Sequence, residues 1–99
     1  MLELDKVECA QFAACLNQEF AINTQAGQLT LRLTSATPLG QPHPAALRAP
    51  FALTFQGECR LRLPQGIYQL HNPQLGQLEI FLVQTGADLT GAYFEAVFN

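Results

Sequence analysis

The feature that most constrains this chain is the alternation of apolar and polar residues in short segments separated by turn residues. Leu29, Leu31 and Leu33 alternate with Thr30, Arg32 and Thr34. A period of two over such a length is typical of a strand with one buried face. The same period, or a short apolar run bounded by turn residues, recurs in the segments 19–23, 51–56, 58–63, 67–71, 77–84 and 92–98.

These segments predict a mainly β fold with one N-terminal helix, in which about six strands form a small antiparallel barrel or roll. The turn residues of 72–76, Asn-Pro-Gln-Leu-Gly, separate two of the strands. We find no internal repeat, and we expect residues 1–99 to form a single domain.

The helix is predicted over about residues 5–17. Asp5 is a good N-cap residue, and Glu8 follows it by three positions as in a capping box. If Asp5 caps the helix, we expect Asp5→Ala to cost roughly 0.5–2 kcal/mol. We expect the helix to plug one open end of the barrel or to cover one face. Its apolar side is formed by Cys9, Phe12, Ala13 and Leu16.

Composition excludes several classes of protein. Of the 99 residues, 48% are hydrophobic and 13% are charged, which is typical of a folded globular chain rather than a disordered one. The net charge is −3 with only five basic residues, so we expect no nucleic-acid partner.

Location and thiol chemistry follow from the same pattern. Charged residues interrupt the N-terminal segment, and no apolar stretch approaches the ~20 residues that span a bilayer. We therefore expect a cytoplasmic protein with no membrane partner. Cys9, Cys15 and Cys59 are odd in number and lack the spacing of a metal site. We predict three reduced thiols, with no bound metal and no cofactor.

The one long irregular segment is Thr37–Pro50, which contains four prolines. Proline excludes a central strand, and loops of this length are often functional. We expect it to present Leu39, His43 and Leu47 to a partner. Arg48 is predicted to anchor the loop to the sheet by pairing with Glu95, a partly covered carboxylate.

Several stretches resemble a known family. They are RAPFALTF at 48–55, LPQGIY at 63–68, LGQLEIFLV at 75–83 and YFEAVFN at 93–99. Together they are similar to small bacterial domains catalogued only as a domain of unknown function. The likeness covers the second half of the chain well. It implies no activity for any residue, and it implies a gene context near phage-tail-collar-like proteins.

The candidate catalytic residues lack the neighbouring residues that would activate them. Ser35 has no nucleophile elbow around it, and the thiol of Cys59 is predicted to point into the core. Glu79 and Glu95 form no cleft-flanking pair that a chain of this size could house. We predict that the protein is not an enzyme and that it has no catalytic, cofactor-binding or metal-binding residues.

A positively charged face is also considered. Alternation places Arg60 and Arg62 on one strand face with Glu58, and Arg32 is a third basic residue nearby. We interpret these residues as a solvated mixed-charge surface, with a surface for an anionic partner as the alternative.

Three functions remain. The first is a protein–protein interaction or assembly module, because too many strand residues are apolar on both faces for one barrel interior to hold them all. The second is a small-molecule-binding barrel, which would need an interior pocket of a few hundred Å³. The third is an enzyme of unknown class. The residues behind the first hypothesis, besides the loop, are Tyr68, Phe81, Val83, Tyr93 and Val97.

Overall fold

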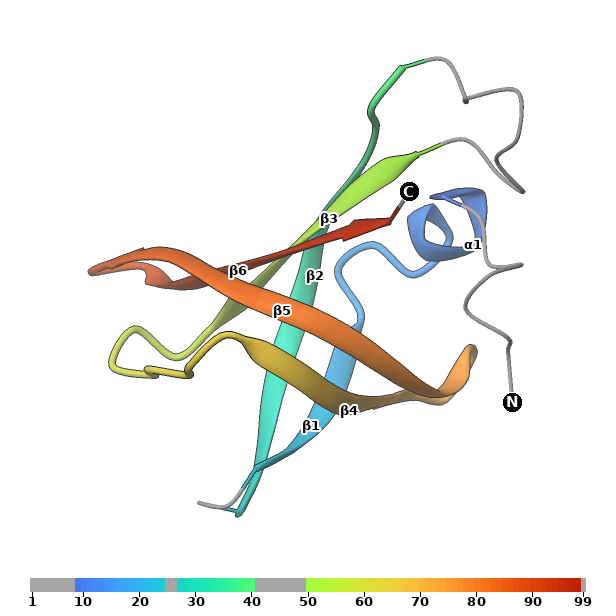
Figure 1. Cartoon of the computed structure of the whole chain (residues 1–99). Helices are drawn as coiled ribbons and strands as arrows, with labels where there is room; N and C mark the ends of the chain where they lie inside the picture. The colour runs from blue at the N-terminus through green and yellow to red at the C-terminus, as the bar shows by residue number, and fades with distance from the viewer. Residues whose placement is uncertain (1–8, 25–26, 41–49, 99) are drawn as a thin grey trace.

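The fold is taken from a computed structural model, which describes residues 9–24, 27–40 and 50–98. One short helix precedes six strands (Figure 1). The elements are α1 (Cys9–Ala13), β1 (Glu19–Thr24), β2 (Gly27–Pro38), β3 (Phe51–Gly57), β4 (Gly66–Asn72), β5 (Gly76–Asp88) and β6 (Gly91–Phe98).

The six strands close into a barrel in the order β1-β2-β3-β6-β5-β4, and every neighbouring pair is antiparallel. The predicted fold class is therefore confirmed. The last strand, β6, lies between β3 and β5. It is therefore an inner strand, with both of its edges paired.

The interior is filled with large apolar side chains. Strand alternation turns one face of each strand inward, and the phenylalanine rings meet there. Phe20 packs edge-on against Phe55 with ring centroids 5.3 Å apart. The largest fully buried side chains are Phe12, Phe20, Phe51, Phe55, Phe94, Ile22, Leu31, Leu33, Leu53, Leu70, Leu78 and Ile80.

Helix α1 plugs one end of the barrel, which is one of the two placements expected from the sequence (Figure 1). The ring of Phe12 lies 5.8 Å from that of Phe51 and 5.6 Å from that of Phe98. The helix ends at Ala13 rather than near residue 17, and tighter turns follow it. Asn17, at φ 68°, reverses the chain toward β1, a conformation that asparagine tolerates better than most residues. The proposed Asp5 cap lies outside the described residues.

The strand predicted at 58–63 is wrong. In a closed barrel both edges of β3 are occupied, by β2 and β6, so no place is left for a strand beside it. The segment instead crosses the other barrel end to reach β4 and begins with a turn in which Leu61 N–H donates to Glu58 C=O. The carboxamide of Gln84 supplies hydrogen bonds to this segment in place of a neighbouring strand. It accepts from Leu63 N–H at 3.0 Å and donates to Leu61 C=O at 3.0 Å.

Strand β2 is longer than predicted and takes in two residues assigned to the loop. Thr37 and Pro38 pair with Ala52 and Phe51 of β3. Proline is tolerated here because β1 pairs with β2 only as far as Arg32, so one side of β2 is an edge at this position. Leu39 N–H then donates to Pro50 C=O at 3.0 Å, which closes the base of the loop.

The turn between β4 and β5 is confirmed, and it is built around a buried asparagine. Asn72 Oδ1 accepts from the backbone N–H groups of Gln74 (2.8 Å) and Leu75 (3.1 Å). Its Nδ2 donates to Gln18 Oε1 and to Glu19 C=O, both at 3.1 Å. Asn72 therefore joins this turn to the segment between α1 and β1. Gly76 closes the turn at φ +82°, which glycine adopts without strain.

Among the described residues, no helix has the length and apolar character that crossing a bilayer requires.

Candidate functional site

The predicted loop site is described only at its start. Leu39 follows β2 with half of its side chain exposed. His43, Leu47 and Arg48 lie outside the described residues, so the contact between Arg48 and Glu95 stays a prediction. Glu95 itself differs from the expectation. It is exposed on the outer wall of β6, opposite Thr54 of β3 and Val83 of β5, rather than partly covered.

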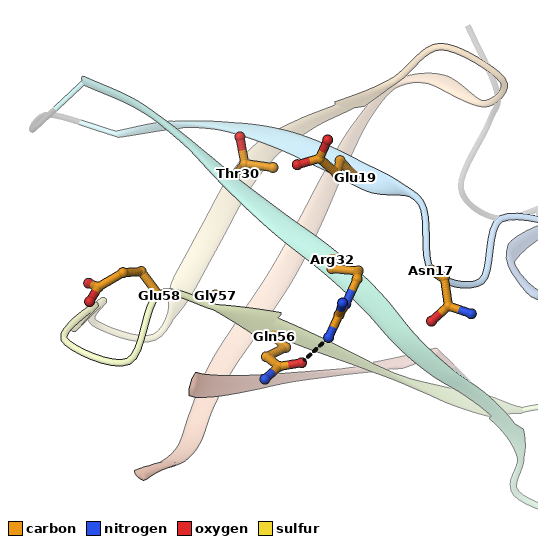
Figure 2. Close-up of a pocket in the computed structure, with 7 residues that line it drawn as sticks. All are labelled: Asn17, Glu19, Thr30, Arg32, Gln56, Gly57 and Glu58. Atoms are coloured by element: carbon orange, nitrogen blue, oxygen red, sulfur yellow. Dashed lines mark hydrogen bonds between the residues drawn. The ribbon is translucent and has the colours of Figure 1, made fainter. Parts of the chain in front are cut away.

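A polar groove of ≈ 500 Å³ lies on the outer wall of β1, β2 and β3 (Figure 2). Arg32 reaches from β2 to Gln56 of β3, where its Nη2 donates to Oε1 at 2.6 Å. Glu19 and Glu58 line the same groove, so it holds one cation and two carboxylates. A mixed set of exposed charges of this kind is typical of solvated surface. The remaining lining residues are Asn17, Thr30 and Gly57.

The groove is joined to the hairpin of β5 and β6 through Gln56, whose Nε2 donates to Thr90 C=O at 2.7 Å. At the hairpin tip, Asp88 Oδ1 accepts from Thr90 N–H at 2.8 Å and from Thr90 Oγ1 at 2.6 Å. These hydrogen bonds, with Thr90 first among the donors, lower the pKa of Asp88. The Asp88 network orders the tip, at which Leu89 is 98% exposed.

The three thiols are not joined in a disulfide. Burial raises the pKa of the Cys9 and Cys15 thiols, and the Cys15 thiol faces Asn72 Oδ1 at 3.9 Å. Cys59 is half-buried in the turn after β3, beside the carboxylate of Glu58, and not in the core as predicted. Among residues 9–24, 27–40 and 50–98, no three His, Cys, Asp or Glu side chains group together as metal ligands would.

Two large apolar side chains stand side by side on the outer wall. Ile67 of β4 and Phe81 of β5 are directly opposite in the antiparallel ladder, and they are 69% and 50% exposed. The neighbours of Phe81 on β5, Ile80 and Leu82, point into the core, so strand alternation forces Phe81 outward. Directly opposite residues have Cβ atoms about 4.5–5.5 Å apart, close enough to form one apolar surface. We call these two residues the Ile67–Phe81 face.

This face continues into a second groove, of ≈ 430 Å³, which we call the seam groove. Ile67 belongs to both surfaces. The groove lies where the end of β1, the connection from β3 and the start of β4 meet. Tyr68 Oη donates to Pro64 C=O at 2.5 Å, which ties the connection to β4. The lining residues are Thr24, Arg62, Leu63, Pro64, Gly66, Ile67 and Tyr68.

Of the described residues that line the seam groove, Arg62 alone is charged. Its Nη1 donates to Cys59 C=O at 3.0 Å and to Leu61 C=O at 2.8 Å. The sequence interpretation that put Arg60 and Arg62 on one strand face is wrong, because residues 58–63 do not form a strand. Arg62 faces the groove, whereas Arg60 is exposed elsewhere on the connection.

Sequence reasoning found part of this surface. Phe81 was among the residues expected to face outward, because Leu78, Ile80 and Leu82 already supply an inward face. Ile67 was read only as part of a short strand. The exposure of Ile67 could have been predicted from Gln69, a polar residue two positions further along, which lies on the same outer face of β4. No sequence pattern could have predicted the seam groove, because it forms from segments that meet only when the barrel closes.

Comparison with known proteins gives a family and no activity. A family described as Domain of unknown function (DUF6916) matches residues 7–98. No curated protein and no solved structure matches the chain.

Proposed function

The chain belongs to the DUF6916 family of domains of unknown function, and we propose that it is a non-catalytic protein–protein interaction module whose contact surface is the Ile67–Phe81 face. The observation that carries this proposal is the pairing of two exposed, large apolar side chains on one barrel wall. Single exposed apolar residues are ordinary, but adjoining ones that continue into a groove are typical of contact surfaces.

The closed barrel sets how such a module can bind. Where neighbouring strands of the barrel are fully paired, the contact has to come from side chains on the outer wall. An apolar centre within a polar surround is the usual anatomy of a protein interface. An assembly role fits the gene context near phage-tail-collar-like proteins that the family resemblance implies, and makes such proteins candidate partners.

The other two hypotheses receive less support. A small-molecule-binding barrel would need space in an interior whose large side chains are fully buried against one another. For catalysis, the polar groove brings Glu19 and Glu58 together with Arg32, but this exposed mixed-charge set is typical of solvated surface, and no thiol lines it among the described residues. Neither hypothesis has an observation in its favour that matches the Ile67–Phe81 face.

The proposal is tested by affinity capture from the source cells, with bound proteins quantified by mass spectrometry. The double variant Ile67→Thr with Phe81→Thr removes the apolar face while keeping residues that favour strands. Leu89→Thr is the matched control, because Leu89 is also exposed but lies at the hairpin tip.

We expect at least one specifically captured protein to be lost several-fold with the double variant and kept with Leu89→Thr. Unchanged melting temperatures would show that both variants fold. The proposal is wrong if every captured protein is retained by a folded double variant.

A further inference from the structure

The seam between β1 and β4 is the shortest ladder in the barrel. The two strands pair only through Ala21 with His71 and Ile22 with Leu70. By contrast, β1 and β2 pair over six positions. Beyond these two pairs β1 and β4 diverge (Figure 1), and β4 extends back by four residues, 66–69. In the part of the chain that the structure describes, no strand covers these residues on the β1 side.

An uncovered strand edge has a chemical consequence. In an antiparallel strand, alternate residues direct their N–H and C=O groups toward the neighbour on each side. Residues 66–69 are paired with β5 on one side, so their other backbone groups face the seam groove. Such groups form a ready template for an incoming extended chain.

We propose that the seam groove binds an extended peptide segment of a partner protein, which adds as a strand to residues 66–69 of β4 and carries a carboxylate for Arg62. This inference rests on the proposed function and specifies the partner's chemistry at the same surface. The apolar lining supplies the side-chain contacts. Half-buried Leu63 and Tyr68 flank the groove, and exposed Ile67 links it to the Ile67–Phe81 face.

The carboxylate follows from the geometry of Arg62. Both hydrogens of Nη1 are used by the carbonyls of Cys59 and Leu61, which fixes the plane of the guanidinium group. Within residues 9–24, 27–40 and 50–98, no acceptor is bound to Nε or Nη2 of Arg62. These two atoms present the parallel pair of N–H groups that holds a carboxylate in a bidentate manner.

Charge distinguishes this groove from the one in Figure 2. There, Glu19 and Glu58 line the same surface as Arg32 and compete with any anion. Among the described residues that line it, the seam groove has Arg62 and no acidic residue. The local positive charge of Arg62 favours an acidic segment over a basic one.

The probe is the synthetic peptide acetyl-Thr-Val-Thr-Asp-Thr-amide, titrated into ¹⁵N-labelled full-length protein and followed by amide chemical shifts. Its valine and aspartate are two positions apart, so in an extended chain both face the same side. A second peptide has asparagine in place of aspartate. We expect saturable shifts at Leu63, Ile67 and Tyr68 with the aspartate peptide, and about fivefold weaker binding of the asparagine peptide.

Two further controls separate the contributions. Arg62→Gln should weaken binding about fivefold, whereas Arg60→Gln, in the same connection but outside the groove, should leave it unchanged. Two isomeric peptides N-methylated on alternate residues test the backbone contact. The isomer methylated on the edge that faces β4 should lose binding, and the other isomer should keep it.

The inference is overturned if no shifts occur at residues 63–68, or if both methylated isomers bind equally. It is also overturned if hexanoate, a free apolar carboxylate, shifts the same amides at lower concentration than the peptide. These failures leave the proposed function standing when Ile67→Thr with Phe81→Thr still abolishes capture of a partner. If the peptide does not bind as expected and the folded double variant still captures every partner, both proposals are rejected.

Discussion

Replacing Asn72 by alanine should be among the most damaging single polar substitutions in this chain. Asn72 is completely buried and forms hydrogen bonds with two segments that lie more than 50 positions apart in the sequence. In Asn72→Ala, the N–H of Leu75 and the C=O of Glu19 both lose their partner. The N–H of Gln74 and the thiol of Cys15 lose an acceptor as well.

The size of the effect can be worked out from these contacts. A buried backbone group left without a partner costs about 1–3 kcal/mol. Leu75 is buried, so its N–H should bear the larger part of this cost, whereas exposed Gln74 can turn to water. We therefore expect a loss of about 3 kcal/mol in the free energy of unfolding. For a domain of this size that corresponds to a melting temperature lower by roughly 12–24 °C.

The assay is urea denaturation followed by circular dichroism, with a thermal melt alongside. Asn23→Ala is the matched control, because Asn23 is exposed on β1, and it should change stability by less than about 0.5 kcal/mol. If Asn72→Ala proves as stable as Asn23→Ala, our account of this turn is refuted.

Three further predictions follow from individual contacts. Asp88 has an ordinary pKa of 3.8, and its hydrogen bonds lower this pKa in the folded state. Its contribution to stability is therefore fully present above the pKa of the unfolded state and is lost as the pH falls through the pKa of the folded state. Wild type should therefore lose its advantage over Asp88→Asn when denaturation is compared at pH values falling from about 5 toward 2, and a constant difference would contradict this. Gly91→Ala places a Cβ 2.7 Å from Gln56 Cγ and 3.0 Å from Gly57 C=O, so unfolding measurements should show a loss of about 1–3 kcal/mol, and an unchanged midpoint would argue against that crowding. In native protein, iodoacetamide should modify half-buried Cys59 before fully buried Cys15, and the reverse order by peptide mapping would be evidence against the burial described.

The fold class could be predicted because alternation reports directly on burial. The β2 pattern at Leu31 and Leu33 and the β5 pattern at Leu78, Ile80 and Leu82 each place one residue type on the inner wall. The turn at 72–76 was visible because asparagine, proline and glycine have specific backbone preferences. These signals are local, and they therefore survive without knowledge of the rest of the chain.

The errors at residues 58–63 and at Glu95 have a common cause, which is closure of the barrel. Leu61 and Leu63 alternate as strand residues do, but β6 occupies the position beside β3 that they would need. Alternation there reflects half-buried residues covering a barrel end. The exposure of Glu95 has the same origin, because β6 as an inner strand turns that side chain to the outer wall.

The candidate site was only partly accessible to sequence reasoning. Phe81 could be assigned to the outer wall from its neighbours. The meeting of Ile67, Arg62 and the uncovered edge of β4 depends on where β1 and β4 diverge, which no local pattern encodes. The burial of Asn72 was hidden for the same reason, because its partners Gln18 and Glu19 lie in another segment.

The most direct test of the central claim is site-specific photo-crosslinking in the source cells. The photoreactive residue p-benzoylphenylalanine replaces Phe81 in one variant and Thr30, exposed in the polar groove of Figure 2, in the other. If the Ile67–Phe81 face is the contact surface, the variant at position 81 should cross-link to a discrete protein partner and the variant at position 30 should not. A partner cross-linked from position 30 and not from position 81 would contradict the account.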